Sequence, residues 1–263
     1  MLLQKDFNTA AKSLATTARS VVENVLIIER IDSTQACALR LVDQAEAEDI
    51  TLPTTLIIAG EQEQGRGRSD RSWISPPGGL YLSWVASSIG VDAIAKLPMI
   101  AAAAVSEAIL GLGIENVQIK WPNDLLIEGR KCAGCLIHAR HGETTWAVVG
   151  IGINLEHTPE VPEGQTLRPT SVADHLHGDM TEEVVNRVLR VTTEELAAGI
   201  ADADASLVRW KKRLVHRPGD EMTIRLGDAS EIHGRFTGLT NEGHLRLECD
   251  GGERTIAAGD VVE

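Results

Sequence analysis

The chain has 263 residues, of which 43% are hydrophobic and 24% charged, and its formal net charge is −13. A chain of this length buries well over half of the surface that it exposes when unfolded, so it needs no disulfide or metal in order to fold. The composition excludes collagen and wholesale disorder, and apolar stretches such as residues 99–105 fall far short of the roughly 20 residues that span a bilayer. The acidic balance argues against a surface that binds nucleic acid by bulk charge.

Cysteine usage and the N-terminus bear on the compartment. The four cysteines, Cys37, Cys132, Cys135 and Cys249, are few and unevenly spaced, which is more typical of a reducing compartment than of a secreted disulfide framework. We therefore expect a cytoplasmic protein. Residues 1–25 carry both basic and acidic side chains and no apolar signal core, so we expect a helical N-terminal extension, with a transit peptide as the alternative.

Up to about residue 213 the sequence predicts strands alternating with helices. Runs of apolar, β-favouring residues predict strands over residues 25–31, 54–59, 80–86, 117–121, 124–127, 133–139 and 145–155. Helical patterns and capping residues predict helices over residues 34–47, 91–113, 170–176 and 181–200. Short turns join the strands that follow residue 117, so these strands should be antiparallel.

The pattern changes after the basic run at residues 211–213. Short β segments with turns rich in Gly, Asp and Asn are predicted over residues 221–226, 231–239, 244–249 and 253–257. We therefore expect a domain boundary near residue 213, with residues 1–213 forming an α/β body and residues 214–263 a small β-barrel or sandwich.

One polar loop is unusually rich in arginine and glycine. It reads Gly65-Arg66-Gly67-Arg68-Ser69-Asp70-Arg71-Ser72-Trp73. Glycines let backbone amides approach an anion closely, and arginines supply forked donors that suit phosphate or carboxylate oxygens. The loop thus indicates an anion site, although a solvated basic loop has the same composition.

Two further segments carry polar or small residues at strand positions. In Lys120-Trp121-Pro122-Asn123-Asp124, a lysine at a strand end can present its ammonium to a phosphate or carboxylate, or can simply lie at the rim of a hairpin. In Gly150-Ile151-Gly152-Ile153-Asn154, both glycines face one side of the strand, where a ligand can lie flat against the backbone. Tight packing or a bulge is the alternative for the glycines.

Together the three segments resemble, in order and wording, the catalytic domain of biotin protein ligases, the biotin–[acetyl-CoA-carboxylase] ligases. The resemblance runs from about Ile31 to Leu155, and it includes the flanking segments 32–34, 80–83 and 130–134. It implies an α+β fold, in which a mixed, mainly antiparallel sheet with helices, like that of class II synthetases, precedes a C-terminal SH3-like β-barrel. It also implies catalysis in two steps: biotin and MgATP form biotinyl-5'-AMP, and a lysine of a biotin carboxyl carrier protein or domain then attacks it.

The resemblance also implies roles for individual residues. The catalytic residues would be Lys120, Arg66 and Arg68, which can neutralise the charge that builds up when a carboxylate attacks a phosphate. Biotin would be bound by Ser33, Thr34, Gln62, Gly65, Arg66, Tyr81, Lys120, Gly150 and Gly152. The nucleotide would be bound by Arg68, Arg71, Trp73 and Asn154.

Two features set limits on the expected function. Only some 30 residues precede Asp32, which is too few for the DNA-binding domain of the bifunctional ligases, so we expect a ligase without DNA or membrane partners, either a monomer or a weak homodimer. Cys132 and Cys135 form a single C-x-x-C without a second pair, and residues i and i+3 of a strand face opposite ways, so we expect no metal site.

Two alternatives remain open from the sequence. Lipoate or octanoate ligases and transferases share the superfamily, but they would lack the arginine loop that ends in Trp73. A non-catalytic biotin or nucleotide sensor is the other, and the intact Lys120 and arginine loop give it no support.

Overall fold

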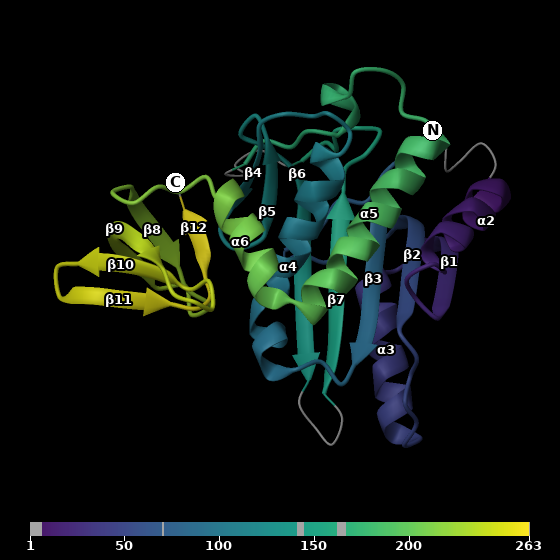
Figure 1. Ribbon diagram of the computed structural model, residues 1–263, viewed down its shortest axis with the longest axis horizontal. Helices are drawn as coiled ribbons and strands as arrows, with labels where there is room; N and C mark the ends of the chain where they lie inside the picture. The colour runs from purple at the N-terminus through teal and green to yellow at the C-terminus, as the bar shows by residue number, and fades with distance from the viewer. Residues whose placement is uncertain (1–6, 70, 141–144, 162–166, 263) are drawn as a thin grey trace.

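The protein is described by a computed structural model that covers residues 7–69, 71–140, 145–161 and 167–262. A seven-stranded sheet with helices forms the larger part, and a five-stranded antiparallel sheet near the C-terminus forms the smaller part (Figure 1). The expected α+β architecture, with a mainly antiparallel sheet followed by a C-terminal β structure, is confirmed.

The large sheet has the strand order β1-β2-β3-β7-β6-β5-β4. Its strands are β1 (Asn24–Ile31), β2 (Thr55–Gln62), β3 (Leu80–Ser87), β4 (Val117–Lys120), β5 (Asp124–Ile127), β6 (Arg130–Arg140) and β7 (Trp146–Ile153). β1 runs parallel to β2, while every other neighbouring pair is antiparallel. The antiparallel arrangement predicted for the strands after residue 117 is thus confirmed for β4 to β7.

Helices cover the two faces of this sheet unequally. One face carries α4 (Val91–Leu110) and α5 (Glu182–Ala201), against which α6 (Ala203–Arg213) and α2 (Phe7–Ala18) pack. The other face is covered over part of its length by α3 (Thr34–Ala47), whose buried Ala38 and Val42 form a small cluster with Val85 and Val148. The remainder of this second face is open to a ligand.

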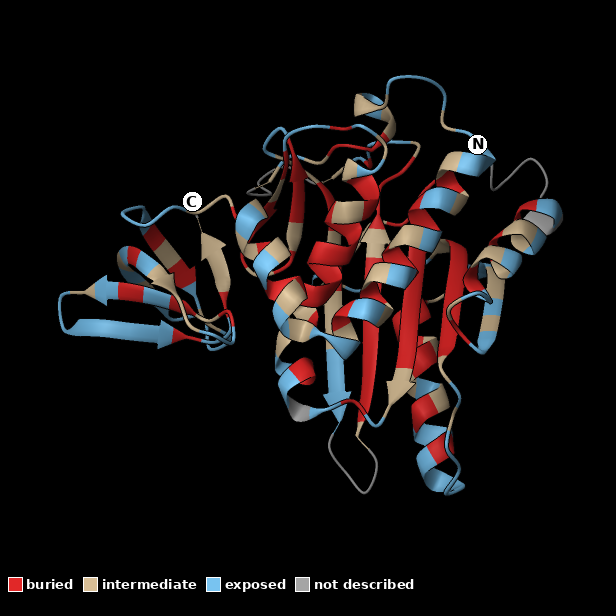
Figure 2. Cartoon of the chain, viewed as in Figure 1, coloured by how far each residue is buried: buried red, intermediate tan, exposed pale blue. Residues whose placement is uncertain are grey.

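Helix α4 forms the centre of the main core. Its segment Asp92–Leu110 is long and apolar enough to cross a membrane by length and composition alone, and 72% of the most apolar window is buried inside the protein. Figure 2 shows the same burial along the central strands and the helices that cover them. The helix therefore has the environment of a core helix in a globular domain.

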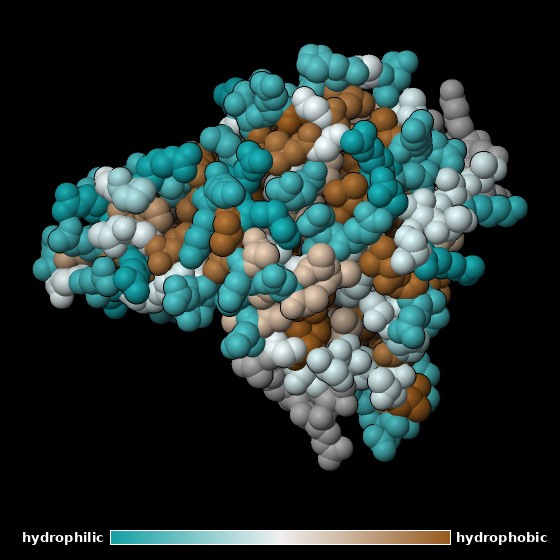
Figure 3. Space-filling view, in the orientation of Figure 1, coloured by the Kyte–Doolittle hydropathy of each residue, from teal (hydrophilic) through white to brown (hydrophobic). Residues whose placement is uncertain are grey.

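The C-terminal sheet has the order β11-β10-β9-β8-β12. Its strands are β8 (Glu221–Arg225), β9 (Glu231–Leu239), β10 (Leu245–Cys249), β11 (Gly252–Ile256) and β12 (Asp260–Val262). It is joined to the body because Trp121 donates its indole N–H to Gly243 O at 3.0 Å, and because Phe236 and Leu245 belong to the same core cluster as α4. The far end of this sheet presents mostly hydrophilic side chains in Figure 3.

One predicted element is wrong, and two elements of the structure were not predicted. The helix predicted over residues 170–176 is wrong: only a 3-10 turn, η1 (Ala173–His175), forms there, and the chain is extended again at Leu176. The sequence reading also missed α6 and the three-residue strand β12.

Candidate functional site

A cavity of about 670 Å³ lies on the open part of the α3 face of the large sheet. Strand alternation explains its position: Ser83 pairs with Gly150 and Tyr81 with Gly152, on the same side of the sheet as Val85 and Val148 but beyond the N-terminus of α3. The volume suits a small-molecule ligand. Residues from the start of α3, the arginine loop, β4 to β7 and the C-terminal sheet all line it.

One end of the cavity is uncharged and polar. Ser33 caps α3, its hydroxyl oxygen accepting the Ala36 N–H at 3.4 Å. The next residue, Thr34, donates both its backbone N–H and its hydroxyl to Gln62 Oε1, at 2.9 and 3.1 Å. Gln62 in turn donates to Ser75 Oγ at 2.8 Å. Side chains that are tied to one another in this way give the pocket fixed hydrogen-bonding groups, as a polar ring system requires.

The two glycines of β7 leave space that neighbouring side chains fill. A Cβ atom on Gly150 would overlap Gln35 Oε1, and one on Gly152 would overlap the indole nitrogen of Trp73. Trp73 therefore lies directly on the strand, and its buried indole N–H has no hydrogen-bond partner among the described residues. Only glycine at these positions allows this close approach.

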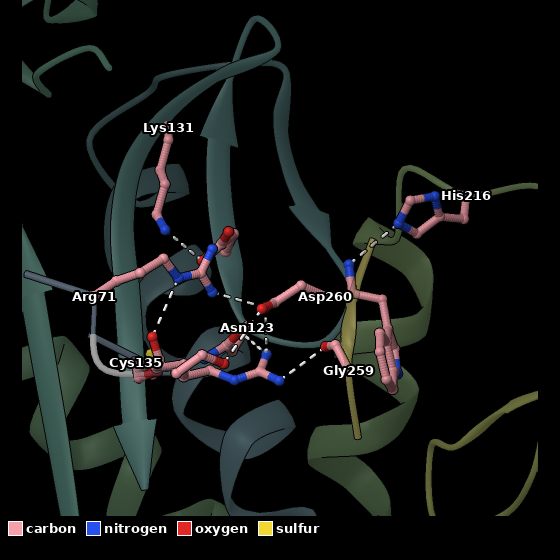
Figure 4. A network of polar contacts seen from close by, with 11 residues as sticks. Arg71, Asn123, Lys131, Cys135, His216, Gly259 and Asp260 are labelled. Atoms are coloured by element: carbon pink, nitrogen blue, oxygen red, sulfur yellow. Dashed lines mark hydrogen bonds and ion pairs between the residues drawn. The ribbon is translucent and has the colours of Figure 1, made fainter. Parts of the chain in front are cut away.

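The arginine loop folds back on itself and reaches the C-terminal sheet. Arg68 donates to Asn123 Oδ1 at 3.1 Å and to Gly259 O at 2.8 Å, and Arg71 pairs with Asp260 Oδ1 at 2.8 Å (Figure 4). Burial lowers the pKa of Arg68, and the nearby carboxylates of Asp260 and Asp124 oppose that shift. The arginines are thus held beside the cavity by residues far away in the sequence.

Two lysines line the cavity. Lys120, at the end of β4, is only 5% exposed. Lys131, on β6, lies with Nζ 2.7 Å from Asp124 Oδ1 and 5.4 Å from the centre of the Trp73 ring. The sequence reading assigned a role only to Lys120. Lys131 lies in the 130–134 segment that contributed to the resemblance, but nothing in the sequence distinguishes it from an ordinary hairpin lysine.

The structure brings most of the predicted site residues together. Ser33, Thr34, Gln62, Arg66, Arg68, Arg71, Trp73, Lys120, Gly150, Gly152 and Asn154 line the cavity. Gly65 and Tyr81 do not: Gly65 accepts the Trp73 N–H, and Tyr81 donates its hydroxyl to Pro76 O at 2.6 Å under the turn at Gly79. The cavity is also lined by residues to which the sequence assigned no role, among them Gln35, Asn123, Asp124, Lys131 and Asp260.

The charge around the cavity is predominantly positive. Arg66, Arg68, Arg71, Lys120 and Lys131 line it, with Asp124 and Asp260 as carboxylate partners. A site of this kind binds anions and stabilises negative charge that develops during a reaction. Within the residues that the structure describes, no group of three or more His, Cys, Asp or Glu side chains could hold a metal ion.

Comparison with known sequences agrees with this geometry. Residues 27–154 match the model of the biotin/lipoate A/B protein ligase family, and residues 219–262 match the biotin protein ligase C-terminal domain. A biotin–[acetyl-CoA-carboxylase] ligase of Paracoccus denitrificans is 33% identical over 89% of this chain and 98% of its own length. The bifunctional ligase/repressor BirA of Escherichia coli is 31% identical over 90% of this chain and 73% of its own length.

The chain is also similar to solved structures of biotin protein ligases. The biotin protein ligase of Aquifex aeolicus in complex with biotin and ATP has a TM-score of 0.68 and 26% identity, covering 91% of this chain and 98% of that one. The biotin protein ligase of Leishmania major in complex with biotinyl-5-AMP, at 20% identity and a TM-score of 0.58, shares the fold.

Proposed function

This chain belongs to the biotin protein ligase family and is an enzyme, and we propose that it activates biotin with ATP as biotinyl-5'-AMP and transfers the biotin to a lysine of a carboxyl carrier protein or domain. The observation that carries the proposal is the composition of one cavity. An uncharged polar end at Ser33, Thr34 and Gln62 adjoins a cluster of arginine and lysine side chains. Biotin has the matching halves, an uncharged ring system and a carboxylate.

The polar end supports binding of the ring system. The ureido group of biotin offers two N–H donors and one carbonyl acceptor, and Ser33, Thr34 and Gln62 supply hydroxyl and amide groups that can pair with them. Gly150 and Gly152 let Gln35 and Trp73 lie close against the strand that forms the floor of the cavity. The bicycle would thus be held by shape and by a few polar contacts.

The cationic cluster supports the first chemical step. The biotin carboxylate attacks the α-phosphorus of ATP, a C–O–P mixed anhydride forms, and the bond to pyrophosphate breaks. Two anions must approach each other, and arginine and lysine side chains that are already in place lower the barrier by neutralising them. We assign this role to Arg66, Arg68, Lys120 and Lys131. The magnesium ion enters with ATP as part of the substrate.

The nucleotide would occupy the side of the cavity formed by Trp73, Arg71 and Asn154. Asn154 is 4% exposed, and its amide donates to Thr170 O at 3.0 Å, so its position is fixed. In the second step the amine of the carrier lysine attacks the carbonyl of the anhydride, an amide bond forms, and AMP leaves. We infer that both steps take place in the cytoplasm. We also infer that residues 1–213 form the catalytic domain and residues 214–263 the C-terminal domain.

Pyrophosphate exchange tests the proposal. The protein is incubated with ATP, labelled pyrophosphate and one acid at a time, namely biotin, lipoate or octanoate. Exchange with biotin alone is expected, because lipoate and octanoate lack the ureido group that Ser33, Thr34 and Gln62 would bind. Exchange with lipoate but not biotin would select the rival activity, and no exchange with any acid would select a non-catalytic sensor. Transfer is then measured with labelled biotin and a purified carrier domain.

A further inference from the structure

A short segment of chain lies beside the ends of two cavity strands. Lys131 of β6 donates its backbone N–H to Arg168 O at 2.8 Å and accepts the Thr170 N–H at 2.9 Å. Asn154, which follows β7, accepts the Val172 N–H at 2.8 Å and donates its side-chain amide to Thr170 O at 3.0 Å. Segment 168–173 therefore contacts the backbone of Lys131 and the side chain of Asn154, both of which line the cavity.

One carboxylate oxygen holds this segment to a second part of the cavity wall. Asp174 Oδ2 accepts the Thr158 hydroxyl at 2.6 Å, the Thr170 hydroxyl at 3.1 Å and the Ser171 N–H at 3.1 Å. Thr158 precedes Pro159, which also lines the cavity. Three donors thus meet at one oxygen, and they come from two segments, one at Thr158 and one at Thr170 and Ser171.

Local capping explains only part of this arrangement. Ser171 and Asp174 exchange side-chain to backbone hydrogen bonds, as in a capping box, which satisfies the start of the 3-10 turn η1. That local motif does not require the Thr158 hydroxyl, which belongs to a different segment, or the Thr170 hydroxyl. Burial tends to raise the pKa of Asp174, but the hydrogen bonds from Thr158, Ser171 and Thr170 outweigh it and lower the pKa to about 2, so the carboxylate is charged at neutral pH.

We propose that Asp174 is a positioning residue for the ligation reaction: it fixes segment 168–173 and, through Thr170, holds Asn154 and Lys131 in place at the nucleotide side of the cavity. The assignment of that side rests on the proposed function. Asp174 does not line the cavity itself, so its effect passes through Thr158 and Thr170. The charged acceptor makes stronger hydrogen bonds than a neutral one, which explains the use of a carboxylate here.

The test uses two variants of the full-length chain that remove different parts of the arrangement. Asp174→Asn keeps a side-chain oxygen for the Ser171 N–H but removes the charge, and Thr158→Val removes only the bond between segments. Each should raise the KM for ATP in biotin-dependent pyrophosphate exchange by about threefold to tenfold, the loss expected from one hydrogen bond, while the KM for biotin stays within twofold of the parent. Asp174→Glu should restore part of the loss.

The double variant gives the decisive comparison. If both side chains act through one bond, Asp174→Asn combined with Thr158→Val should raise the KM for ATP no more than Asp174→Asn alone. Asp202→Asn is the matched control, because Asp202 caps α6 by accepting the Ala205 N–H at 3.0 Å and lies outside the cavity lining. It should leave both KM values unchanged.

Three outcomes would overturn the proposal. An unchanged KM for ATP in a folded Asp174→Asn protein removes the role, and equal increases in both KM values together with a lower melting temperature reduce it to general stability. Additive effects in the double variant show that Thr158 and Asp174 act separately. Failure of the proposed function is distinct, since the parent protein would then show no biotin-dependent exchange at all.

Discussion

Arg71 of the arginine loop and Asp260 of the last strand form an ion pair of 2.8 Å that joins the two parts of the chain. The same aspartate lies 3.8 Å from Arg68, whose other nitrogen donates to the carbonyl of Gly259 (Figure 4). The loop that we assign to the reacting groups is therefore docked on the C-terminal sheet. This contact gives the C-terminal sheet a direct part in shaping the cavity, which Arg225, Val261 and Val262 also line.

Removing the charge at Asp260 should release the arginine loop. Asp260→Asn keeps the shape of the side chain but loses the ion pairs with Arg68 and Arg71. Arg71 is 58% exposed and Arg68 lies 3.8 Å from the carboxylate, so the two pairs stabilise the docked loop only modestly. We therefore expect tryptic cleavage at the loop to become about two- to fivefold faster. Limited proteolysis followed by mass spectrometry measures this. Biotin with ATP should slow cleavage in both proteins.

The control for this prediction lies in the same sheet. Asp228 is an exposed aspartate that bonds within its own turn to Ser230, so Asp228→Asn should leave loop cleavage at the parent rate. Equal cleavage rates in Asp260→Asn and the parent protein would show that the ion pairs do not hold the loop.

A side chain at position 152 should displace Trp73. In Gly152→Ala the new Cβ would overlap the indole ring, so the ring must leave the strand and the cavity must change shape. We expect a higher KM for both biotin and ATP and a loss of about 1–3 kcal/mol in the free energy of unfolding, the usual cost of overpacking. Steady-state kinetics and urea unfolding measure the two effects.

Gly227→Ala is the matched control, because a Cβ there meets open space. It should change neither the kinetics nor the stability by a comparable amount. Parent-like KM values in Gly152→Ala would mean that Trp73 has no part in ligand binding.

Local signals in the sequence were sufficient for most elements. Helix α3 begins after Ser33 and ends at Ala47 as predicted, because a capping residue and a periodic apolar face define it without help from the rest of the chain. The glycines of β7 were correctly placed on one face by strand alternation alone. The cavity residues on β2, β7 and the start of α3 follow from these local features.

Features that depend on distant contacts could not be predicted. Nothing near Asp260 indicates that it meets Arg71, since that contact arises only when the C-terminal sheet docks on the body. Strand β12 has only three residues, too few for an alternating pattern. Lys131 resembles any hairpin lysine until Asp124 and Trp73 are placed beside it. The predicted helix at residues 170–176 is reduced to one 3-10 turn, after which the chain is extended at Leu176.

Alkaline pH should destabilise the protein through its buried thiols. Burial raises the pKa of Cys132 from 9.0 to about 12, and burial also raises the pKa of Cys135. The folded state thus keeps these protons while the unfolded state releases them. Their contribution to stability is complete below about pH 9 and is lost as the pH rises from there towards 12, at about 1.4 kcal/mol per pH unit for each thiol.

Urea unfolding at pH 8 and pH 10 measures this slope. Cys132→Ala should show a shallower loss between the two pH values than the parent protein. Val149→Ala opens space in the same core without removing a titratable group, so it should lower stability by similar amounts at both pH values. An identical slope in Cys132→Ala and the parent would show that this thiol does not contribute.

Lys131 should be required for adenylation. Its ammonium lies between Asp124 and the ring of Trp73 at the cavity surface, where it can meet the biotin carboxylate and the α-phosphate. Removing one preorganised positive group from such a site costs about 100- to 1,000-fold in rate, so Lys131→Ala should reduce biotin-dependent pyrophosphate exchange by that factor. Because the side chain lies at the rim of the core, the melting temperature should change little.

Variants of two further lysines compare the loss of a positive charge at the cavity with the loss of one elsewhere on the protein. Lys120→Ala should also abolish adenylation. Because Lys120 is only 5% exposed, its removal can also affect stability, so the melting temperature of this variant must be measured together with its exchange rate. Lys212 is exposed at the end of α6 and outside the cavity lining, and Lys212→Ala should exchange pyrophosphate at the parent rate. A parent-like rate in Lys131→Ala would leave the neutralisation of the reacting anions to Lys120 and the arginine loop alone.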